Sequence, residues 1–251
     1  MKPLILISND DSINAPGVHY LAECVREMGD VYVVAPERPQ SGQAAALTVN
    51  APLRITEKPC DTEGVRMFIV TGTPVDCIKL ALHAIVPRRP DVVFSGINHG
   101  SNSGINVIYS GTMGATIEGC LRGIPSVGFS ILDHSMDANF SLSKRFIVEI
   151  AHKVLKDGLP EGVCLNVNIP ANVEPRGIKV CRGARGHWSE EYERYLDPHC
   201  VPFYWLSGRF VNDEPEATDT DEYWLAHSYV SVVPTVVDHT AHDCIATLLH
   251  D

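Results

Sequence analysis

The 251-residue sequence has little positive charge and no long apolar run. It contains 20 lysines and arginines against 31 aspartates and glutamates, which gives a net charge of −11 at neutral pH. Because basic patches supply most of the affinity for nucleic-acid backbone, this balance argues against a protein that binds polymeric nucleic acid. No apolar stretch approaches the roughly 18–20 residues that a membrane helix needs, so we expect no membrane partner.

The sequence also lacks the signatures of secretion and of zinc binding. The first residues, MKPLILISNDDS, hold a short apolar stretch followed by two carboxylates. This is too short and too acidic for a signal peptide, so we expect a cytoplasmic protein. None of the eight cysteines forms a CxxC pair, and several lie in apolar runs, so we expect reduced, structural thiols.

Apolar strands and helical spacing alternate over the first two thirds of the chain. The predicted strands are 4–8, 31–36, 91–98, 126–131 and 164–170, with shorter strands at LTV, LRIT and VRMFIV within 47–70. Helices are predicted between them, one beginning at Thr73-Pro74 with threonine as the cap. Near-continuous apolar strands between helices predict a doubly wound, mostly parallel α/β sheet of the Rossmann-like class, over residues 1–185.

The remaining residues, 186–251, predict a C-terminal extension. Residues 183–228 carry nine aromatic side chains with weak periodicity, which favours an arm or hairpin that packs on the body or on another subunit. A strand at 229–234 and a closing helix at 240–249 follow. We therefore expect a homo-oligomer, a homodimer or a homotetramer, built with this extension.

The main candidate for chemistry follows the first strand. Asp10 and Asp11 are adjacent at its end, and two buried carboxylates are costly unless a cation neutralises them. Ser41 follows the second strand, and Asn98 ends the strand at 91–98. The carboxyl ends of parallel strands meet at one edge of a sheet. These four side chains therefore predict an oxygen-only site for one divalent cation per subunit: Mg²⁺, Mn²⁺ or Ca²⁺.

A glycine-rich helix start at YSGTMGAT would face this metal site as a phosphate cradle. The unpaired N–H groups of a helix N-terminus bind anions. Together, the metal site and the cradle suggest metal-assisted hydrolysis of a phosphate ester, with Asp10 and Asp11 as the catalytic carboxylates. Two other classes remain open: a non-catalytic nucleotide-binding protein, and a phosphoacceptor signalling module. The second normally needs an aspartate and a lysine at strand ends where this chain has Asn98 and Ser130.

The sequence resembles the SurE family of survival-protein nucleotidases. The resemblance rests on NDDSINAPGVHYL, VAPERPQSG, TGTPVDC, SGINHGSNSG, YSGTMGATIEG and LNVNIP, in that order, and more weakly on TDTDEYWLAHSYVSVVP. It implies a metal-dependent phosphatase that acts on nucleoside 5′- and 3′-monophosphates. It also implies an α/β sandwich whose C-terminal extension exchanges elements between subunits.

The same resemblance implies residue roles. It carries the metal ligands over to Asp10, Asp11, Ser41 and Asn98. The substrate and phosphate contacts become the following residues: Asn9, Asn102, Ser110, Gly111 and Thr112.

Two positions depart from the family pattern, and one histidine needs an interpretation. Ser12 and Ser228 stand where the family usually has glycine. A positive φ at such a position would strain serine by something on the order of 1 kcal/mol. His99 is the histidine inside a metal-loop motif, and we favour a structural or solvent-facing role for it over acid–base chemistry.

Overall fold

The central feature of the molecule is one nine-stranded sheet, seen in a computed structural model that describes residues 2–135 and 137–248. The strand order is β3-β4-β2-β1-β5-β6-β7-β13-β8. The strands are β1 (Leu4–Ser8), β2 (Asp30–Pro36), β3 (Ile55–Lys58), β4 (Val65–Val70), β5 (Val92–His99), β6 (Ser126–Ile131), β7 (Val163–Ile169), β8 (Ile178–Val180) and β13 (Val230–Val236). From β4 to β7 all neighbours are parallel. β3 runs antiparallel to β4, and β13 runs antiparallel to β7 but parallel to β8.

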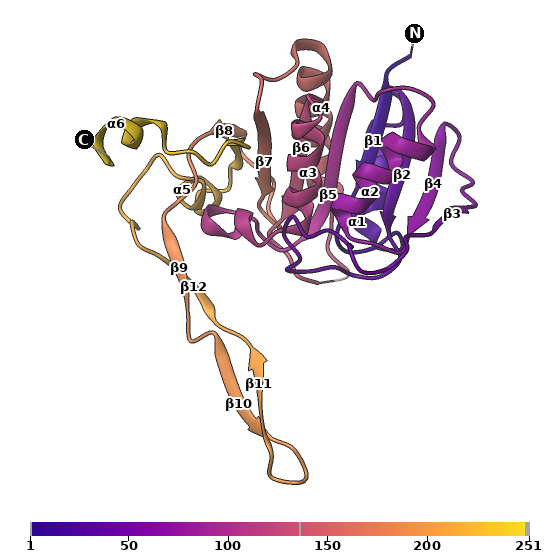
Figure 1. Cartoon of the computed structure of the whole chain (residues 1–251). Coiled ribbons are helices and arrows are strands. Elements are labelled where there is room, and N and C mark those ends of the chain that lie inside the picture. Colours follow the sequence, from indigo (N-terminus) through magenta and orange to yellow (C-terminus); the bar gives the residue numbers. More distant parts are fainter. Residues whose placement is uncertain (1, 136, 249–251) are drawn as a thin grey trace.

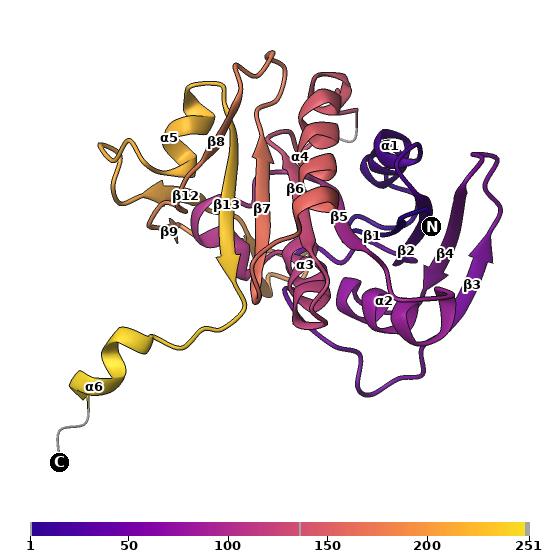
Figure 2. The ribbon, with the colours of Figure 1, turned by 90° about the horizontal axis from the view of Figure 1, so that it is seen from above.

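Helices cover both faces of this sheet (Figure 2). The helix pair α1 (Pro16–Val25) and α4 (Lys144–Asp157) lies on one face, and α2 (Pro74–Leu80) and α3 (Gly111–Leu121) lie on the other. Short helical segments are η1 (Ala81–Ile85), η2 (Gly104–Ile108), η3 (Ser141–Ser143), α5 (Asp221–Ala226), η4 (His242–Cys244) and α6 (Ile245–Leu248). The predicted doubly wound, mostly parallel α/β fold is therefore confirmed.

Two apolar layers hold the helices to the sheet. On the α1 and α4 side, Leu21 and Ile147 belong to a cluster with the buried sheet residues Phe94 and Phe129. On the α2 and α3 side, Ile78 packs in a second cluster with Leu4 and Leu6. Ile5 and Ile7 of β1 belong to the first cluster, so the apolar side chains of this strand point to both faces, which is why its sequence reads as an unbroken apolar run.

The C-terminal extension projects a long arm away from the sheet (Figure 1). The arm consists of two successive antiparallel ribbons, one of β9 (Gly186–Ser189) with β12 (Arg209–Asn212) and one of β10 (Tyr192–Leu196) with β11 (Pro202–Leu206). After the arm, the chain returns through α5, and β13 enters the sheet between β7 and β8.

Two local predictions were wrong. LTV (47–49) is not a strand: the loop that contains it is held by side chains, because Thr73 Oγ1 donates to Ala46 O (2.7 Å) and the Asp76 carboxylate accepts from Thr48 N (3.1 Å). The closing helix predicted at 240–249 is reduced to η4 and α6, and residue 249 lies outside the described residues. By contrast, the predicted start of α2 is confirmed, with Thr73 and Asp76 forming a capping box.

Candidate active site

The candidate site lies where the order of strands in the sheet reverses. The chain adds β2 on one side of β1 and later adds β5 on the other side. In sheets of this kind, the crevice outside the carboxyl ends of the two strands at the reversal is the usual place for a ligand. Asp10 and Asp11 follow the end of β1, and Asn98 and His99 end β5.

Asp10 is held against the start of α3. Its side chain is buried, and its Oδ1 accepts a hydrogen bond from Thr112 Oγ1 at 2.5 Å. Burial raises the pKa of the Asp10 carboxyl to about 6, with the charge of Asp11 adding to the shift and the bond from Thr112 opposing it. A buried carboxylate of this kind gains stability from a neighbouring cation.

Gly111 explains how α3 comes so close to this carboxylate. A Cβ atom at Gly111 would lie 2.8 Å from Asp10 Cβ and 2.9 Å from its Oδ2. A side chain at this position would therefore push the helix away from Asp10. Ser110 caps the helix by accepting from Met113 N at 3.0 Å, and its carbonyl accepts from Gly114 N at 2.9 Å. The N–H groups of Gly111 and Thr112 are thus the ones that this turn leaves available to an anion.

Asp11 is fixed by His99, an arrangement that the sequence analysis missed. Asp11 Oδ2 lies 2.9 Å from His99 Nδ1 and accepts from His99 N at 3.1 Å. The imidazole is almost fully buried, its ring lies edge-on to Phe140, and its Nε2 has no partner among the described residues. Because a carboxylate oxygen accepts, this geometry assigns the N–H to Nδ1, which donates a hydrogen bond to Asp11. Both bonds go to Oδ2, so Asp11 can present Oδ1 to a ligand.

The two other proposed metal ligands lie close to the aspartates. Asn98 Nδ2 donates to Gly100 O at 2.8 Å, which turns its Oδ1 away from that contact and makes the oxygen available. Gln40 N donates to Asp10 O at 2.7 Å. Ser41 is exposed and directly follows Gln40, so this bond holds its segment beside Asp10. The structure therefore gathers at one sheet edge the segments that carry all four side chains.

Asn9 and Asn102, which the family resemblance assigns to substrate or phosphate binding, donate hydrogen bonds from their side chains to protein atoms. Asn9 is fully buried and donates from Nδ2 to Ser12 O at 2.9 Å, which closes the turn after β1. Asn102 is also buried, and its Nδ2 donates to Ser130 Oγ at 2.8 Å. In this structure both amide nitrogens maintain loop geometry.

Serine does occupy left-handed backbone at both positions that depart from the family pattern. Ser12 has a φ of +92° and Ser228 a φ of +63°. The strain expected for Ser12 therefore falls in the turn directly after the two aspartates.

The donors at this site fit a hard divalent cation. Across residues 2–135 and 137–248 there is no group of three or more His, Cys, Asp or Glu side chains that could hold a metal ion. The ligands available here are two carboxylates, a hydroxyl and an amide oxygen. Oxygen-only sets of this kind suit Mg²⁺, Mn²⁺ or Ca²⁺ and exclude a thiolate-bound zinc.

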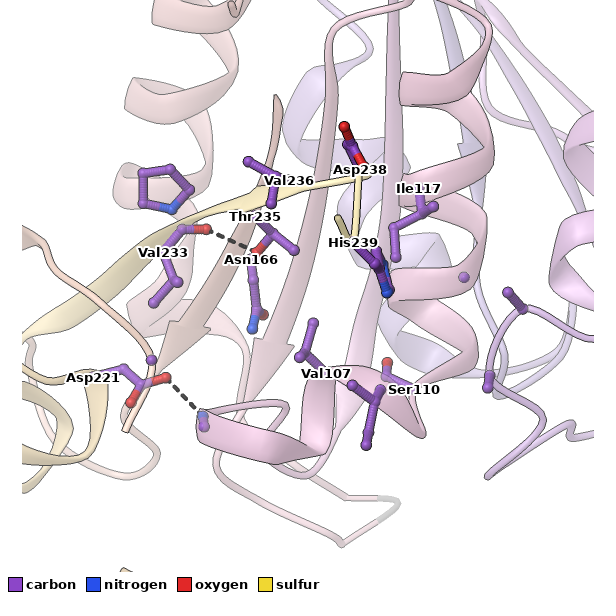
Figure 3. A pocket seen from close by; sticks show the side chains of 17 residues that line it. Val107, Ser110, Ile117, Asn166, Asp221, Val233, Thr235, Val236, Asp238 and His239 are labelled. Atoms are coloured by element: carbon purple, nitrogen blue, oxygen red, sulfur yellow. Dashed lines mark hydrogen bonds between the residues drawn. The ribbon is translucent and has the colours of Figure 1, made fainter. Parts of the chain in front are cut away.

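A separate cavity of about 620 Å³ lies beside the start of α3 (Figure 3). It is bounded by η2, by Ser110 before α3 and Ile117 within it, and by β7 and the end of β13. Neither Asp10 nor Asp11 is among the described residues that line it. The acidic pair and this cavity thus both border the start of α3 but are separate from each other.

Within the described part of the chain, no helix is both long enough and apolar enough to cross a membrane.

Comparisons with known proteins give matches along most of the chain. Residues 5–190 match the family model described as "Survival protein SurE". The chain is 50% identical over 241 residues to a protein of Phocaeicola vulgatus named 5′-nucleotidase SurE, covering 96% of this chain and 93% of that protein. A protein of the same name from Christiangramia forsetii is 51% identical over 252 residues, covering 98% and 96%. The crystal structure of the SurE protein from Aquifex aeolicus superposes with a TM-score of 0.83 at 36% identity, with 98% of each chain covered.

Proposed function

The chain belongs to the survival protein SurE family, and we propose that it is a divalent-metal-dependent nucleotidase. It hydrolyses nucleoside 5′-monophosphates, and also 3′-monophosphates, to nucleoside and phosphate. The observation that carries this proposal is the packing of the Asp10 carboxylate against the N-terminus of α3, where Thr112 and Gly111 contact it. A phosphate seated on the helix start lies beside the acidic pair, and the names of the relatives point to the same activity.

The residues of the site have different proposed roles, which follow from their positions. Asp10, Asp11, Ser41 and Asn98 hold one cation per subunit. When bound, this cation supplies Lewis-acid polarisation of the phosphoryl group and activation of water. The N–H groups of Gly111 and Thr112 bind the phosphate oxygens and favour the negative charge that develops on them. Asp11, the more exposed carboxylate and the one oriented by His99, accepts a hydrogen bond from the attacking water.

Catalysis without metal and binding without turnover are the alternatives that an assay must separate. We would measure phosphate release from a panel of 5′- and 3′-nucleoside monophosphates with Mg²⁺, Mn²⁺ or Ca²⁺, and with excess chelator after metal removal. The expected result is activity with at least one metal and none with chelator. Full activity after exhaustive metal removal, or no turnover with any metal, would contradict the proposal.

We further propose that the arm mediates assembly into a homodimer or homotetramer. Every residue of β10 and β11 is exposed, and these strands include Tyr192, Trp205 and Leu206, each about two thirds exposed. Large exposed apolar patches mark association surfaces, and an isolated two-stranded ribbon is marginally stable in water. The base of the arm is anchored differently, because Trp188 packs on Phe210 and donates from Nε1 to Asn106 Oδ1 at 2.8 Å.

Shortening the arm tests this assembly. Ser189 and Arg209 are paired in the basal ribbon, so residues 190–208 can be replaced by Asn-Gly, which favours a tight hairpin turn. Light scattering should give an oligomer for the full chain and a smaller species for the shortened one. A monomeric full chain, or an unchanged mass after shortening, would show that the arm has another role.

The proposed compartment remains the cytoplasm. The described structure has thiols, rather than disulfides, at the following positions: Cys24, Cys60, Cys77, Cys120, Cys164, Cys181 and Cys200. Thiols of this number persist in reducing compartments.

A further inference from the structure

The loop of residues 100–104 connects the metal-ligand end of β5 to η2, and side chains of other elements hold its backbone. Two of these side chains come from β7. Asn168 Oδ1 accepts from Asn102 N at 2.8 Å, and Asn166 Nδ2 donates to Asn102 O at 2.7 Å. Asn168 Nδ2 also donates to Asn166 Oδ1 at 3.1 Å, so the two amides orient each other. Side chains two residues apart on a strand share a face, which allows both to reach the backbone of one residue, Asn102.

The next two residues of the loop are held from the C-terminal extension. Asp221 Oδ2 accepts from Gly104 N at 2.8 Å, the contact drawn as a dashed line beside Asp221 in Figure 3. Glu222 accepts a hydrogen bond from Ser103 Oγ. Both carboxylates belong to the first turn of α5, more than one hundred residues away in the sequence. The loop is therefore clamped between β7 and α5.

Asp221 also ties the loop to the base of the arm. Its side chain is fully buried, and its second oxygen, Oδ1, accepts from Ala184 N at 2.8 Å and from Glu222 N at 2.9 Å. Ala184 lies two residues before β9, where the arm begins. One buried carboxylate thus joins three segments, and the charge-assisted bonds it accepts are stronger than neutral ones.

We propose that Asp221 and Glu222 are positioning residues, which hold the 100–104 loop in the geometry that the substrate requires. This inference rests on the proposed function, and it assigns to the extension a role in the site beyond assembly. A loop rich in glycine, serine and asparagine has many accessible conformations, and fixing it in advance removes that entropic cost from substrate binding. The competing explanation is that the two carboxylates only stabilise the start of α5.

Substitutions of Glu222 and Asp221 distinguish these explanations. Glu222→Ala removes the acceptor for Ser103, Glu222→Gln keeps an oxygen acceptor, and Asp221→Asn replaces one oxygen by an amide group that cannot accept. Glu216→Ala is the matched control, because Glu216 is an exposed glutamate of the same extension. For each variant we would measure kcat and KM with a nucleoside monophosphate at saturating metal, together with the melting temperature.

The expected result is a KM raised roughly tenfold by Glu222→Ala and by Asp221→Asn, because misplaced binding groups weaken the bound geometry. Glu222→Gln should lose less than Glu222→Ala, and Glu216→Ala should match the unsubstituted chain. A fall in melting temperature with unchanged KM would overturn the inference, since only a structural role then remains.

Amide hydrogen exchange provides a readout that does not depend on activity. Faster exchange at Asn102 and Gly104 in Glu222→Ala and Asp221→Asn, with unchanged exchange in β1 and β5, supports the clamp even if the proposed nucleotidase activity fails. Exchange equal to that of the unsubstituted chain at both amides overturns it. The two proposals therefore fail in different measurements.

Discussion

β6 in the central sheet and β11 in the arm are both rich in apolar residues, yet these residues lie in opposite environments. All six residues of β6 are buried, whereas all five residues of β11, PFYWL, are exposed. β6 lies between β5 and β7 inside the sheet and packs against α3, while each arm strand has one neighbour. Burial thus depends on what surrounds a strand, and a strand without such surroundings is suited to meet another molecule.

The first way to test this contrast is to remove one large side chain from each region. Phe129→Ala should lower the free energy of unfolding by about 3–5 kcal/mol, because Phe129 is fully buried against Phe94 and leaves a cavity. Trp205→Ala, at a position 68% exposed, should change it by less than about 0.5 kcal/mol in dilute, dissociated protein. Urea unfolding with chelator present measures both. Equal losses would mean that the arm packs on its own body.

The second test concerns charge in the sheet region. Asp11→Asn should affect the free energy of unfolding differently in the absence and in the presence of metal. Without metal, removal of one of two adjacent charges should leave stability unchanged or slightly raised. With metal at about a hundredfold excess over its Kd, the unsubstituted chain gains roughly 2.7 kcal/mol, and the variant should lose much of this gain together with most turnover.

Thermal unfolding with chelator and across a metal titration checks this prediction. Asp157→Asn, at the exposed end of α4, is the control and should behave as the unsubstituted chain. Equal destabilisation of both forms by Asp11→Asn would identify Asp11 as a structural residue of the turn.

A smaller effect is expected at His99, which lies beside the proposed metal ligands. His99→Phe keeps a ring against Phe140 but removes the side-chain bond to Asp11, while the backbone bond from His99 N remains. Loss of a residue that orients a metal ligand typically weakens affinity by 10- to 100-fold, and we expect about tenfold here. Calorimetric titration with Mn²⁺ measures it, with the exposed His152→Phe as control. An unchanged Mn²⁺ affinity would show that the backbone bond alone orients Asp11.

The smallest effects are expected at the two serines with positive φ, one in the sheet region and one in the extension. Ser12→Gly should stabilise the fold by about 1 kcal/mol, because a φ of +92° is costly for serine and not for glycine. Ser228→Gly should give only a few tenths, since its φ of +63° lies in the left-handed well and glycine loses more entropy on folding. Chemical denaturation of both variants measures the difference. A destabilised Ser12→Gly would mean that the bond from Asn14 N to Ser12 Oγ outweighs the strain.

The sequence was informative where one local pattern determines the structure. Short stretches of consecutive residues show the apolar run of β1, the capping residues of α2 and the polar residues directly after β1. These stretches predicted the sheet and the edge where Asp10 and Asp11 lie. Parallel topology then brought Asn98 and the start of α3 to the same edge without any knowledge of long-range contacts.

The features that the sequence did not reveal depend on contacts between distant segments. The 47–49 stretch has strand-like residues, but side chains of Thr73 and Asp76 hold its loop. The contact between His99 and Asp11 depends on a shift in the pairing of β5 with β6 between Ser95 and Asn98, after which His99 pairs with Ile131. The bonds from α5 to the 100–104 loop span more than one hundred residues, and no local signal indicates them.

The position of β13 has a consequence for how the protein is made. This strand forms hydrogen bonds with β7 on one side and β8 on the other, although both are synthesised before it and the arm comes between. Until residues 230–236 leave the ribosome, β7 has an open edge and β8 has no strand to pair with. An open, apolar strand edge on a partly folded chain invites pairing with other chains. While the arm has emerged and residues 230–236 have not, the nascent sheet is therefore open to such pairing along the edge of β7.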